Sequence, residues 1–185
     1  MMTWKLDPQH TSVAFSAKHL GVATVRGRFD EVAASLELDD PNDPTTGRGT
    51  VTVKAASVTT GSEMRDGHLK NADFLDVEHY PDIVFALKKV TKLGGDTFSV
   101  TADLTIKDVT KEITLGYEHN GSAIDPYGNV KVGGTLTGSI NRSDWGLVWN
   151  VPLGNGGVLV GDKVKLEIDG ELAQVKEPVA VGEAA

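Results

Sequence analysis

The sequence predicts an all-β protein, an antiparallel β-barrel of about eight strands with one short helix near residues 62–72. Three observations support this prediction. Apolar and polar residues alternate with period two in about nine segments. The alternation breaks only between Gly61 and Val77, and twelve of the 21 glycines lie between Gly116 and Gly170.

The alternating segments are the predicted strands. In the first, Val13, Phe15 and Ala17 alternate with Ala14, Ser16 and Lys18, which puts the first three on one face of a strand. The same pattern recurs in eight further segments, at residues 25–29, 36–38, 51–55, 83–87, 98–106, 113–117, 132–140 and 164–168. The opposite positions are rich in Thr, Lys, Glu and Asp, so one face of a mostly antiparallel sheet is expected to meet water.

Turn-forming residues separate the strands, at residues 39–44, 94–96, 120–121, 127–129 and 154–157. The helix is predicted where period two is lost. Residues 62–65, Ser-Glu-Met-Arg, resemble a capped first turn, and the helix is expected to end near residues 71–73. Four residues recur there at helical spacing, Met64, His68, Leu69 and Ala72, and the last two are expected to turn inward.

The glycines favour a closed barrel over a β-sandwich. Several lie inside the 132–140 strand, where glycine permits the sharp bending that closes a sheet. The inward residues are mostly Val, Leu, Ile, Ala and Gly, with few large aromatic side chains to fill a wide interior. An apolar cavity is therefore expected. An ordinary packed core is the alternative.

Composition narrows the class of protein. The formal net charge of −8 disfavours nucleic acid as a partner, and the absence of cysteine excludes disulfides and thiolate chemistry. The sequence has no apolar run of the roughly 18–20 residues that a membrane-spanning helix needs, and its start has no secretory h-region. A cytoplasmic protein is expected, with one domain over residues 1–174 and a flexible tail over 175–185.

Two motifs are especially distinctive: Arg65-Asp-Gly-His-Leu-Lys-Asn-Ala-Asp-Phe74 and Asn141-Arg-Ser-Asp-Trp-Gly146. Others lie at residues 4–20, 26–29, 57–61, 81–85, 102–111 and 160–164. In this order, from Trp4 to about Leu172, they resemble the YceI-like, or lipid/polyisoprenoid-binding, family, although Leu75 and Trp145 stand where Phe is commoner. The resemblance implies a lipocalin-like barrel, no catalysis and no cofactor. It also implies a bound polyisoprenoid, such as an isoprenoid quinone, or a similar amphiphile.

Apolar residues of the barrel are the candidate ligand contacts. Each methylene buried in such a lumen would contribute roughly 0.8 kcal/mol, so chain length would set affinity more than polar contacts. The predicted ligand-binding residues are Val13, Phe15, Val25, Phe29, Val51, Val53, Leu69, Phe74, Phe85, Leu104, Leu136 and Trp145. The competing interpretation is that these side chains pack a core without a ligand.

A polar cluster is predicted around the helix, formed by Arg65, Asp66, His68 and Arg142. Because residues three apart on a helix are neighbours, Arg65 and His68 could converge on a lipid headgroup at the barrel mouth. The alternative is a structural network in which Asp66 or Asp73 pairs with Arg142. Arg142 and Asp144 are themselves expected to form a structural corner beside Trp145.

Two other classes of function remain open. One is a small-molecule enzyme or metal-binding protein that uses Arg65, Asp66 and His68; the other is an interaction module with a filled barrel. The five histidines show no metal-ligand spacing, and the sequence has no G-x-S-x-G, P-loop or dinucleotide motif, so neither a metal nor a cofactor is expected. Edge strands and the family resemblance suggest a homodimer.

Overall fold

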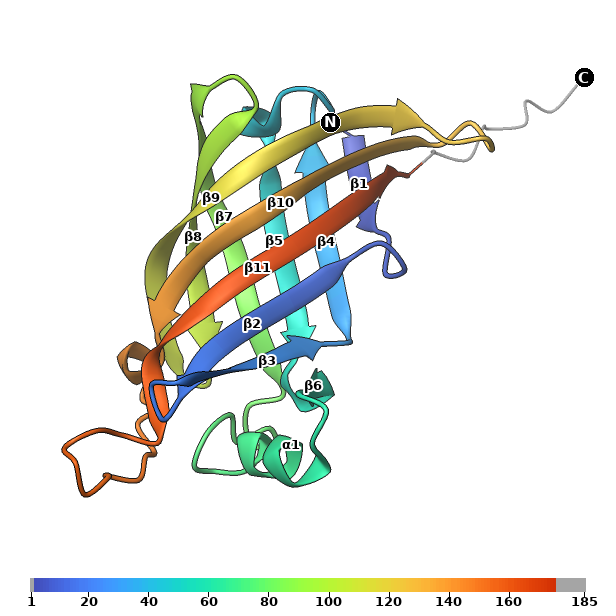
Figure 1. The fold of residues 1–185 in the computed structure, drawn as a ribbon. Helices are drawn as coiled ribbons and strands as arrows, with labels where there is room; N and C mark the ends of the chain where they lie inside the picture. Colours follow the sequence, from blue (N-terminus) through green and yellow to red (C-terminus); the bar gives the residue numbers. More distant parts are fainter. Residues whose placement is uncertain (1, 176–185) are drawn as a thin grey trace, which may run out of the picture.

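The structure, a computed structural model, describes residues 2–175. Its strands form one continuous sheet (Figure 1). The strands are β1 (Met2–Leu6), β2 (Ser12–His19), β3 (Ala23–Phe29), β4 (Val32–Leu38), β5 (Arg48–Lys54), β6 (Val58–Thr59), β7 (Asp82–Gly94), β8 (Thr97–Ile106), β9 (Val109–Ile124), β10 (Val130–Asn141) and β11 (Val160–Gln174). The helical segments are α1 (Glu63–Lys70) and three 3-10 turns, η1 (Pro44–Thr46), η2 (Ala55–Ser57) and η3 (Arg142–Trp145).

The sheet closes on itself as an antiparallel barrel because β11 pairs with the first strands of the chain. Leu6 of β1 pairs with Leu172, and Ser12 of β2 pairs with Asp169 three residues earlier in β11. β1 and β2 thus lie in succession along one neighbour and act as one interrupted strand. β3 with β4, and β5 with β6, are interrupted in the same way. Counted so, the barrel has eight strands, and the predicted fold class is confirmed.

Two predictions about the strands were wrong in detail. Residues 2–6, for which no strand was predicted, form β1, whose Trp4 is 1% exposed and donates from Nε1 to the Leu38 carbonyl at 3.1 Å. The turn expected at Asn120-Gly121 is instead a bulge inside β9. Gly133 pairs with Gly121 and Gly134 with His119, which leaves Asn120 as the extra residue.

The glycines of β10 make room for side chains of the neighbouring strand. A Cβ atom on Gly134 would overlap the ring of Tyr117, and a Cβ on Gly138 would overlap the side chain of Leu115. Both of these large residues come from β9 and point into the barrel, where Leu115 is buried. Because these glycines have no Cβ atom, the two bulky inward side chains can lie over β10 without overlap.

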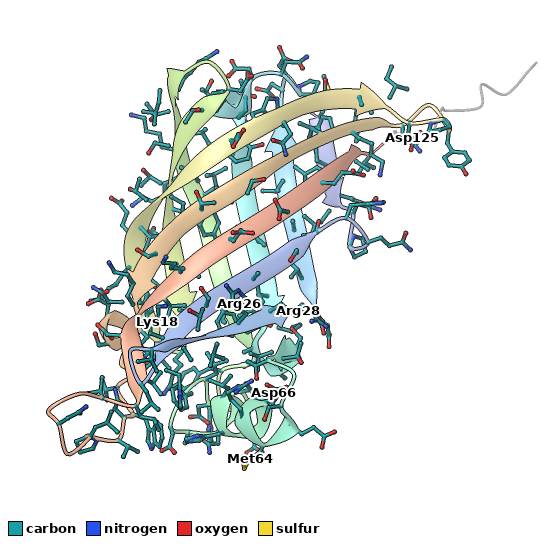
Figure 2. All side chains as sticks on the ribbon, in the orientation of Figure 1. Lys18, Arg26, Arg28, Met64, Asp66 and Asp125 are labelled. Atoms are coloured by element: carbon teal, nitrogen blue, oxygen red, sulfur yellow. The ribbon has the colours of Figure 1, made fainter. Side chains whose placement is uncertain are left out.

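Helix α1 lies across one end of the barrel, called here the lower end from its place in Figure 1. Ser62 caps the helix by accepting from the Arg65 amide, as the sequence predicts. Met64 does not face inward: it is 87% exposed and points away from the barrel (Figure 2). The expectation that Ala72 turns inward is wrong. The helix ends at Lys70, and the next turn leaves Ala72 exposed.

The segment after the helix closes the lower end instead. Phe74 and Leu75 are buried there with Trp145, in the largest of the core clusters. None of the helices formed by residues 2–175 is long and apolar enough to cross a bilayer. Of the predicted tail, residues 176–185 lie outside the described part of the chain.

Candidate functional site

The candidate site is the barrel lumen, which has two adjacent chambers. The lower chamber, next to α1, has a volume of about 270 Å³, and the upper chamber, at the opposite end, about 190 Å³. The two chambers are adjacent and share five wall residues in the middle section of the barrel. That section is made by Val13, Val51, Phe85, Leu136 and Ile168.

Ten of the twelve predicted ligand-binding residues line the lower chamber. They are Val13, Phe15, Phe29, Val51, Val53, Leu69, Phe74, Phe85, Leu104 and Leu136. The period-two pattern placed eight of them on the inner faces of six strands, and barrel closure brought these together with Phe74, which lies in the segment after α1. Leu69 comes from α1 and covers the lower end. Their contact with a ligand stays a prediction.

The other two predicted residues lie elsewhere among the described residues. Val25 pairs with Ala17 in the β2–β3 ladder, and only Ala17 of this pair lines the lower chamber. Trp145 lies in the core cluster around the chamber, 3% exposed, and its Nε1 donates to the Leu104 carbonyl at 3.0 Å. An indole held in this way supports the wall from outside the lumen.

The chemistry of the lower chamber favours apolar ligands. Its wall is made of aliphatic and aromatic side chains together with the buried Arg142. Apolar cavities of roughly 150 Å³ already exclude water and bind small hydrocarbons, and both chambers exceed that size. A hydrocarbon chain that entered this lumen would lose its contact with water without displacing a polar partner.

The upper chamber differs because polar side chains share its wall. Arg48 and Glu37 pair there at 2.8 Å, from Nε to Oε2, and Tyr117 and His119 project from β9. The Tyr117 hydroxyl lies 3.2 Å from Nδ1 of His119. The loop between β4 and β5 lies at this end (Figure 1), and its buried residue Pro44 lines the chamber.

The titratable pair of the upper chamber is held neutral. Burial raises the pKa of Tyr117 to about 12. Burial also lowers the pKa of His119, against the opposing influence of the Asp96 carboxylate and the Pro41 carbonyl. Neither Tyr117 nor His119 was predicted as a site residue. Their inward parity continues the Ile113 alternation, and a histidine at an inward position was the available signal.

The predicted cluster of Arg65 and Asp66 is organised around Thr60. Arg65 donates from Nε to the Thr60 hydroxyl at 2.7 Å and from Nη2 to the Thr60 carbonyl at 2.9 Å. Asp66 accepts from the Thr60 amide at 2.8 Å and from its hydroxyl at 2.5 Å. Although burial acts to raise it, these hydrogen bonds hold the pKa of Asp66 below its ordinary value. The pair thus anchors α1 to the end of β6.

His68 faces a different group of residues. Its Nε2 lies 2.9 Å from the Asp73 carboxylate, and its ring packs edge-on against Phe74 and Trp149 at centroid distances of 5.0 and 4.5 Å. Arg65 is exposed and bonded to Thr60. The expected convergence of Arg65 and His68 is therefore not seen in the structure.

Arg142 is buried and bonded to backbone carbonyls rather than to Asp66 or Asp73. The side chain is 6% exposed and donates to three carbonyls, those of Leu147, Val160 and Gly161. Burial lowers the pKa of Arg142, partly offset by Asp162, but a guanidinium stays charged at neutral pH. Arg142 joins the two ends of the 146–160 segment, which agrees with a structural corner.

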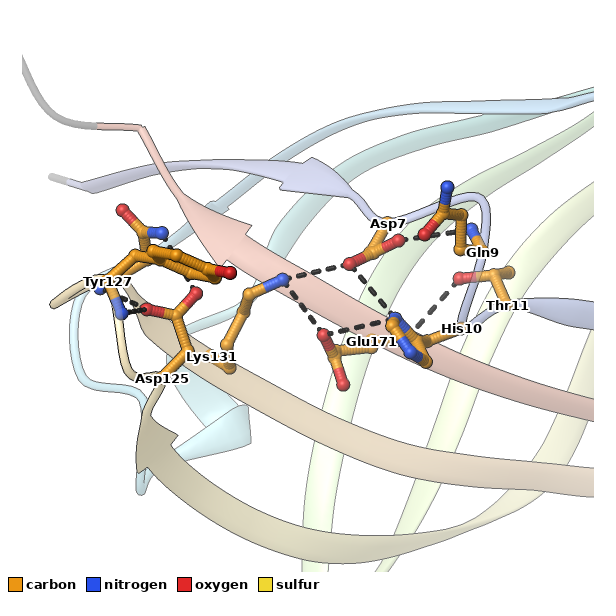
Figure 3. A network of polar contacts seen from close by, with 9 residues as sticks. Asp7, Gln9, His10, Thr11, Asp125, Tyr127, Lys131 and Glu171 are labelled. Carbon is orange, nitrogen blue, oxygen red and sulfur yellow. Dashed lines mark hydrogen bonds and ion pairs between the residues drawn. The ribbon is translucent and has the colours of Figure 1, made fainter.

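One group of candidate metal ligands lies together in residues 2–175, formed by Asp7, His10 and Glu171 (Figure 3). Lys131 bridges the two carboxylates of this group on the side away from His10, with Nζ 2.8 Å from Asp7 and 2.9 Å from Glu171. Hydrogen bonds from Lys131 and His10 hold the pKa of Asp7 well below its ordinary value. The ammonium supplies the positive charge, and the network ties the β1–β2 connection to β10 and β11.

Comparisons with known proteins agree with this architecture. The sequence model of the YceI-like domain matches residues 4–172. A UPF0312 protein of Staphylococcus aureus is 38% identical over 174 residues, which cover 94% of this chain and 98% of that protein. The crystal structure of a Campylobacter jejuni YceI protein is 35% identical with a TM-score of 0.73, covering 86% of this chain and 90% of that chain.

A more distant structure shares the fold. It is described as a polyisoprenoid binding domain from Saccharophagus degradans, and it aligns with a TM-score of 0.70 at 15% identity. The alignment covers 95% of this chain and 100% of that chain. At this identity the likeness bears on the fold alone.

Proposed function

Because the chain belongs to the YceI-like domain family, we propose that it binds a polyisoprenoid or related amphiphilic lipid inside the barrel and carries or stores it without catalysis. The observation that carries this proposal is a barrel lumen with two adjacent chambers, the lower of which is walled by apolar side chains apart from Arg142. One structural neighbour with the same fold is described as a polyisoprenoid binding domain.

The energetics of the lumen suit a long apolar chain. Each buried methylene contributes roughly 0.8 kcal/mol, while association and ordering of the ligand oppose binding. A chain that passed the shared middle section would extend from one chamber into the other and bury many methylenes in succession. Ten wall residues of the lower chamber are the proposed contacts. Among them, Val53 of β5 and Leu136 of β10 face each other from opposite sides of the barrel.

The enzyme alternative is less well supported. Arg65 and Asp66 bind Thr60, whereas His68 binds Asp73, so these three side chains do not act on a common point. An interaction module with a filled barrel is also less well supported, because the lumen has chambers of about 190 and 270 Å³. The expected cytoplasmic location and homodimer remain predictions.

The test is to identify what the purified protein holds. The protein is extracted with organic solvent for lipid mass spectrometry, and a second sample is analysed for metals. A stoichiometric isoprenoid or similar amphiphile would support the proposal. After delipidation, the protein should also bind farnesane, a branched hydrocarbon without a headgroup. Stoichiometric metal without lipid, or failure to bind any long-chain compound, would contradict the proposal.

A further inference from the structure

The upper chamber contains a buried polar atom that the fold leaves unpaired. His119 is 8% exposed, and among residues 2–175 its Nε2 has no hydrogen-bond partner. Buried polar groups in native proteins are nearly always paired, so each exception needs an explanation. His119 also lines the chamber, which places an unpaired nitrogen in the wall of a lumen that is otherwise mostly apolar.

Neighbouring residues hold the His119 ring in position. The Tyr117 hydroxyl lies 3.2 Å from Nδ1, and the buried Phe98 faces the ring edge-on at a centroid distance of 6.4 Å. The His119 amide donates to the Asp96 carbonyl at 2.8 Å, which fixes the backbone beside the bulge of β9. The imidazole is thus oriented through Nδ1 and its face. The Pro41 carbonyl is near enough to raise the pKa of His119, but among residues 2–175 no group has the geometry of a hydrogen bond to Nε2.

The contact with Tyr117 lets the free nitrogen act in two ways. When the Tyr117 hydroxyl donates to Nδ1, Nε2 carries the proton and can donate; when Nδ1 donates, Nε2 can accept. Because both groups are neutral at physiological pH, the site suits an uncharged oxygen. A carboxylate or phosphate would need a counter-charge, but the Arg48 guanidinium in the same wall already pairs with Glu37 and Asp39.

We propose that the upper chamber is a headgroup subsite in which Nε2 of His119, oriented by Tyr117, hydrogen-bonds an uncharged hydroxyl or carbonyl oxygen. The apolar tail of the same ligand then passes the middle section at Phe85 and Leu136 into the lower chamber. This inference rests on the proposed function and names its ligand class: a long apolar chain that ends in a neutral oxygen.

The inference separates the two ends of the barrel. Arg65 and His68 at the lower end have partners of their own, whereas the unpaired nitrogen of His119 is in the upper chamber, whose wall also includes Pro44 of the β4–β5 loop. Ser122 of β9 donates to Asn42 of that loop at 2.9 Å, which ties the loop to the strand that carries His119. A headgroup held here would lie under a covered end, with the tail toward α1.

Three farnesyl compounds with matched chains test this orientation: farnesol, farnesane and farnesyl phosphate. Calorimetry on the delipidated protein should show farnesol binding more tightly than the other two. The His119→Phe variant keeps an aromatic ring but removes the nitrogen. This variant should weaken farnesol binding roughly three- to tenfold, the range expected for one net hydrogen bond, and leave the farnesane affinity unchanged. Arg65→Ala is the control for a headgroup site at the helix and should leave the ratio of the farnesol and farnesane affinities unchanged.

A second variant and a spectroscopic measurement make the test independent of how well His119→Phe folds. His119→Gln places an amide donor at similar reach and should restore part of the preference for farnesol. In the wild-type protein labelled with ¹⁵N-histidine, farnesol should shift the Nε2 resonance of His119 and farnesane should not. That resonance is identified by its loss in a His119 variant.

The outcomes also separate this inference from the proposed function. If the wild-type protein binds none of the three compounds, the proposed function itself fails. If it binds farnesol and farnesane equally, with no shift of the His119 resonance, the lipid site stands and the headgroup subsite is refuted. Tighter binding of farnesyl phosphate than of farnesol, or loss of the preference in Arg65→Ala, would also refute it.

Discussion

Replacing Arg142 by methionine is expected to lower the free energy of unfolding by about 3 kcal/mol. The guanidinium donates to three buried carbonyls, and hydrogen bonds from a charged donor contribute about 1.5–3 kcal/mol each. Methionine also avoids the cost of burying a charge, which is several kcal/mol and offsets much of that sum. For a chain of 185 residues, the net loss corresponds to a drop in Tm of about 6–12 °C.

The assay is urea denaturation followed by tryptophan fluorescence, since Trp145 is buried beside Arg142 in the same 3-10 turn. Arg28→Met is the matched control. Arg28 is 62% exposed in its ion pair with Asp30, so its replacement should cost less than about 1 kcal/mol. Arg142→Lys should recover only part of the loss, because an ammonium lacks the planar guanidinium that reaches three carbonyls.

Ligand binding decides between a structural and a recognition role for Arg142. If the side chain only holds the 146–160 segment, Arg142→Met should lower stability while farnesol and farnesane affinities change by the same factor. An unfolding free energy within about 1 kcal/mol of wild type would refute the three-carbonyl argument. A selective loss of farnesol affinity at unchanged stability would place the headgroup at the lower end.

Three further predictions concern the wall, the packing and the pH dependence. Val53→Trp should lower farnesane affinity at least about tenfold, because the indole fills space in the lumen that the ligand's methylenes would occupy. The free energy of unfolding should change by about 1 kcal/mol or less. Unchanged farnesane binding would contradict the proposed wall. Gly134→Ala should lower the free energy of unfolding, measured by urea denaturation, by about 1–3 kcal/mol, because the new Cβ atom overlaps Tyr117. Gly170→Ala should lower it by less than about 0.5 kcal/mol, because the space at its Cβ position is open. Equal losses in the two variants would contradict this packing. Because the pKa of Asp7 is lowered on folding, its contribution to stability is complete above its ordinary value of 3.8 and is lost as pH falls through the lower folded value. The urea midpoint of Asp7→Asn should therefore lie below that of the wild type near neutral pH, and the two midpoints should converge only as the pH falls below 3.8. A difference that grows as the pH falls would refute this role of Asp7.

Much of the barrel was readable in the sequence because strand periodicity is a local property. Alternation identifies which side chains of a strand share a face, and this was enough to name Phe15, Val53 and Leu104 as inward residues. The capped helix was equally local, since Ser62 accepts from an amide three residues away. The Asn120-Gly121 pair was misread because such a pair suits either a turn or a bulge, and the register with β10 decides between them.

What the sequence by itself determined was the inner face of each strand, and through it the apolar wall. The tertiary structure decided how strands far apart in the chain meet: β1 and β2 share β11, the lumen divides into two chambers, and Arg142 finds carbonyls up to 19 residues away. It also decided the environment of His119. Parity places that ring inside the barrel, but its burial and its unpaired Nε2 depend on neighbouring strands and on the covering loop, which no local pattern records.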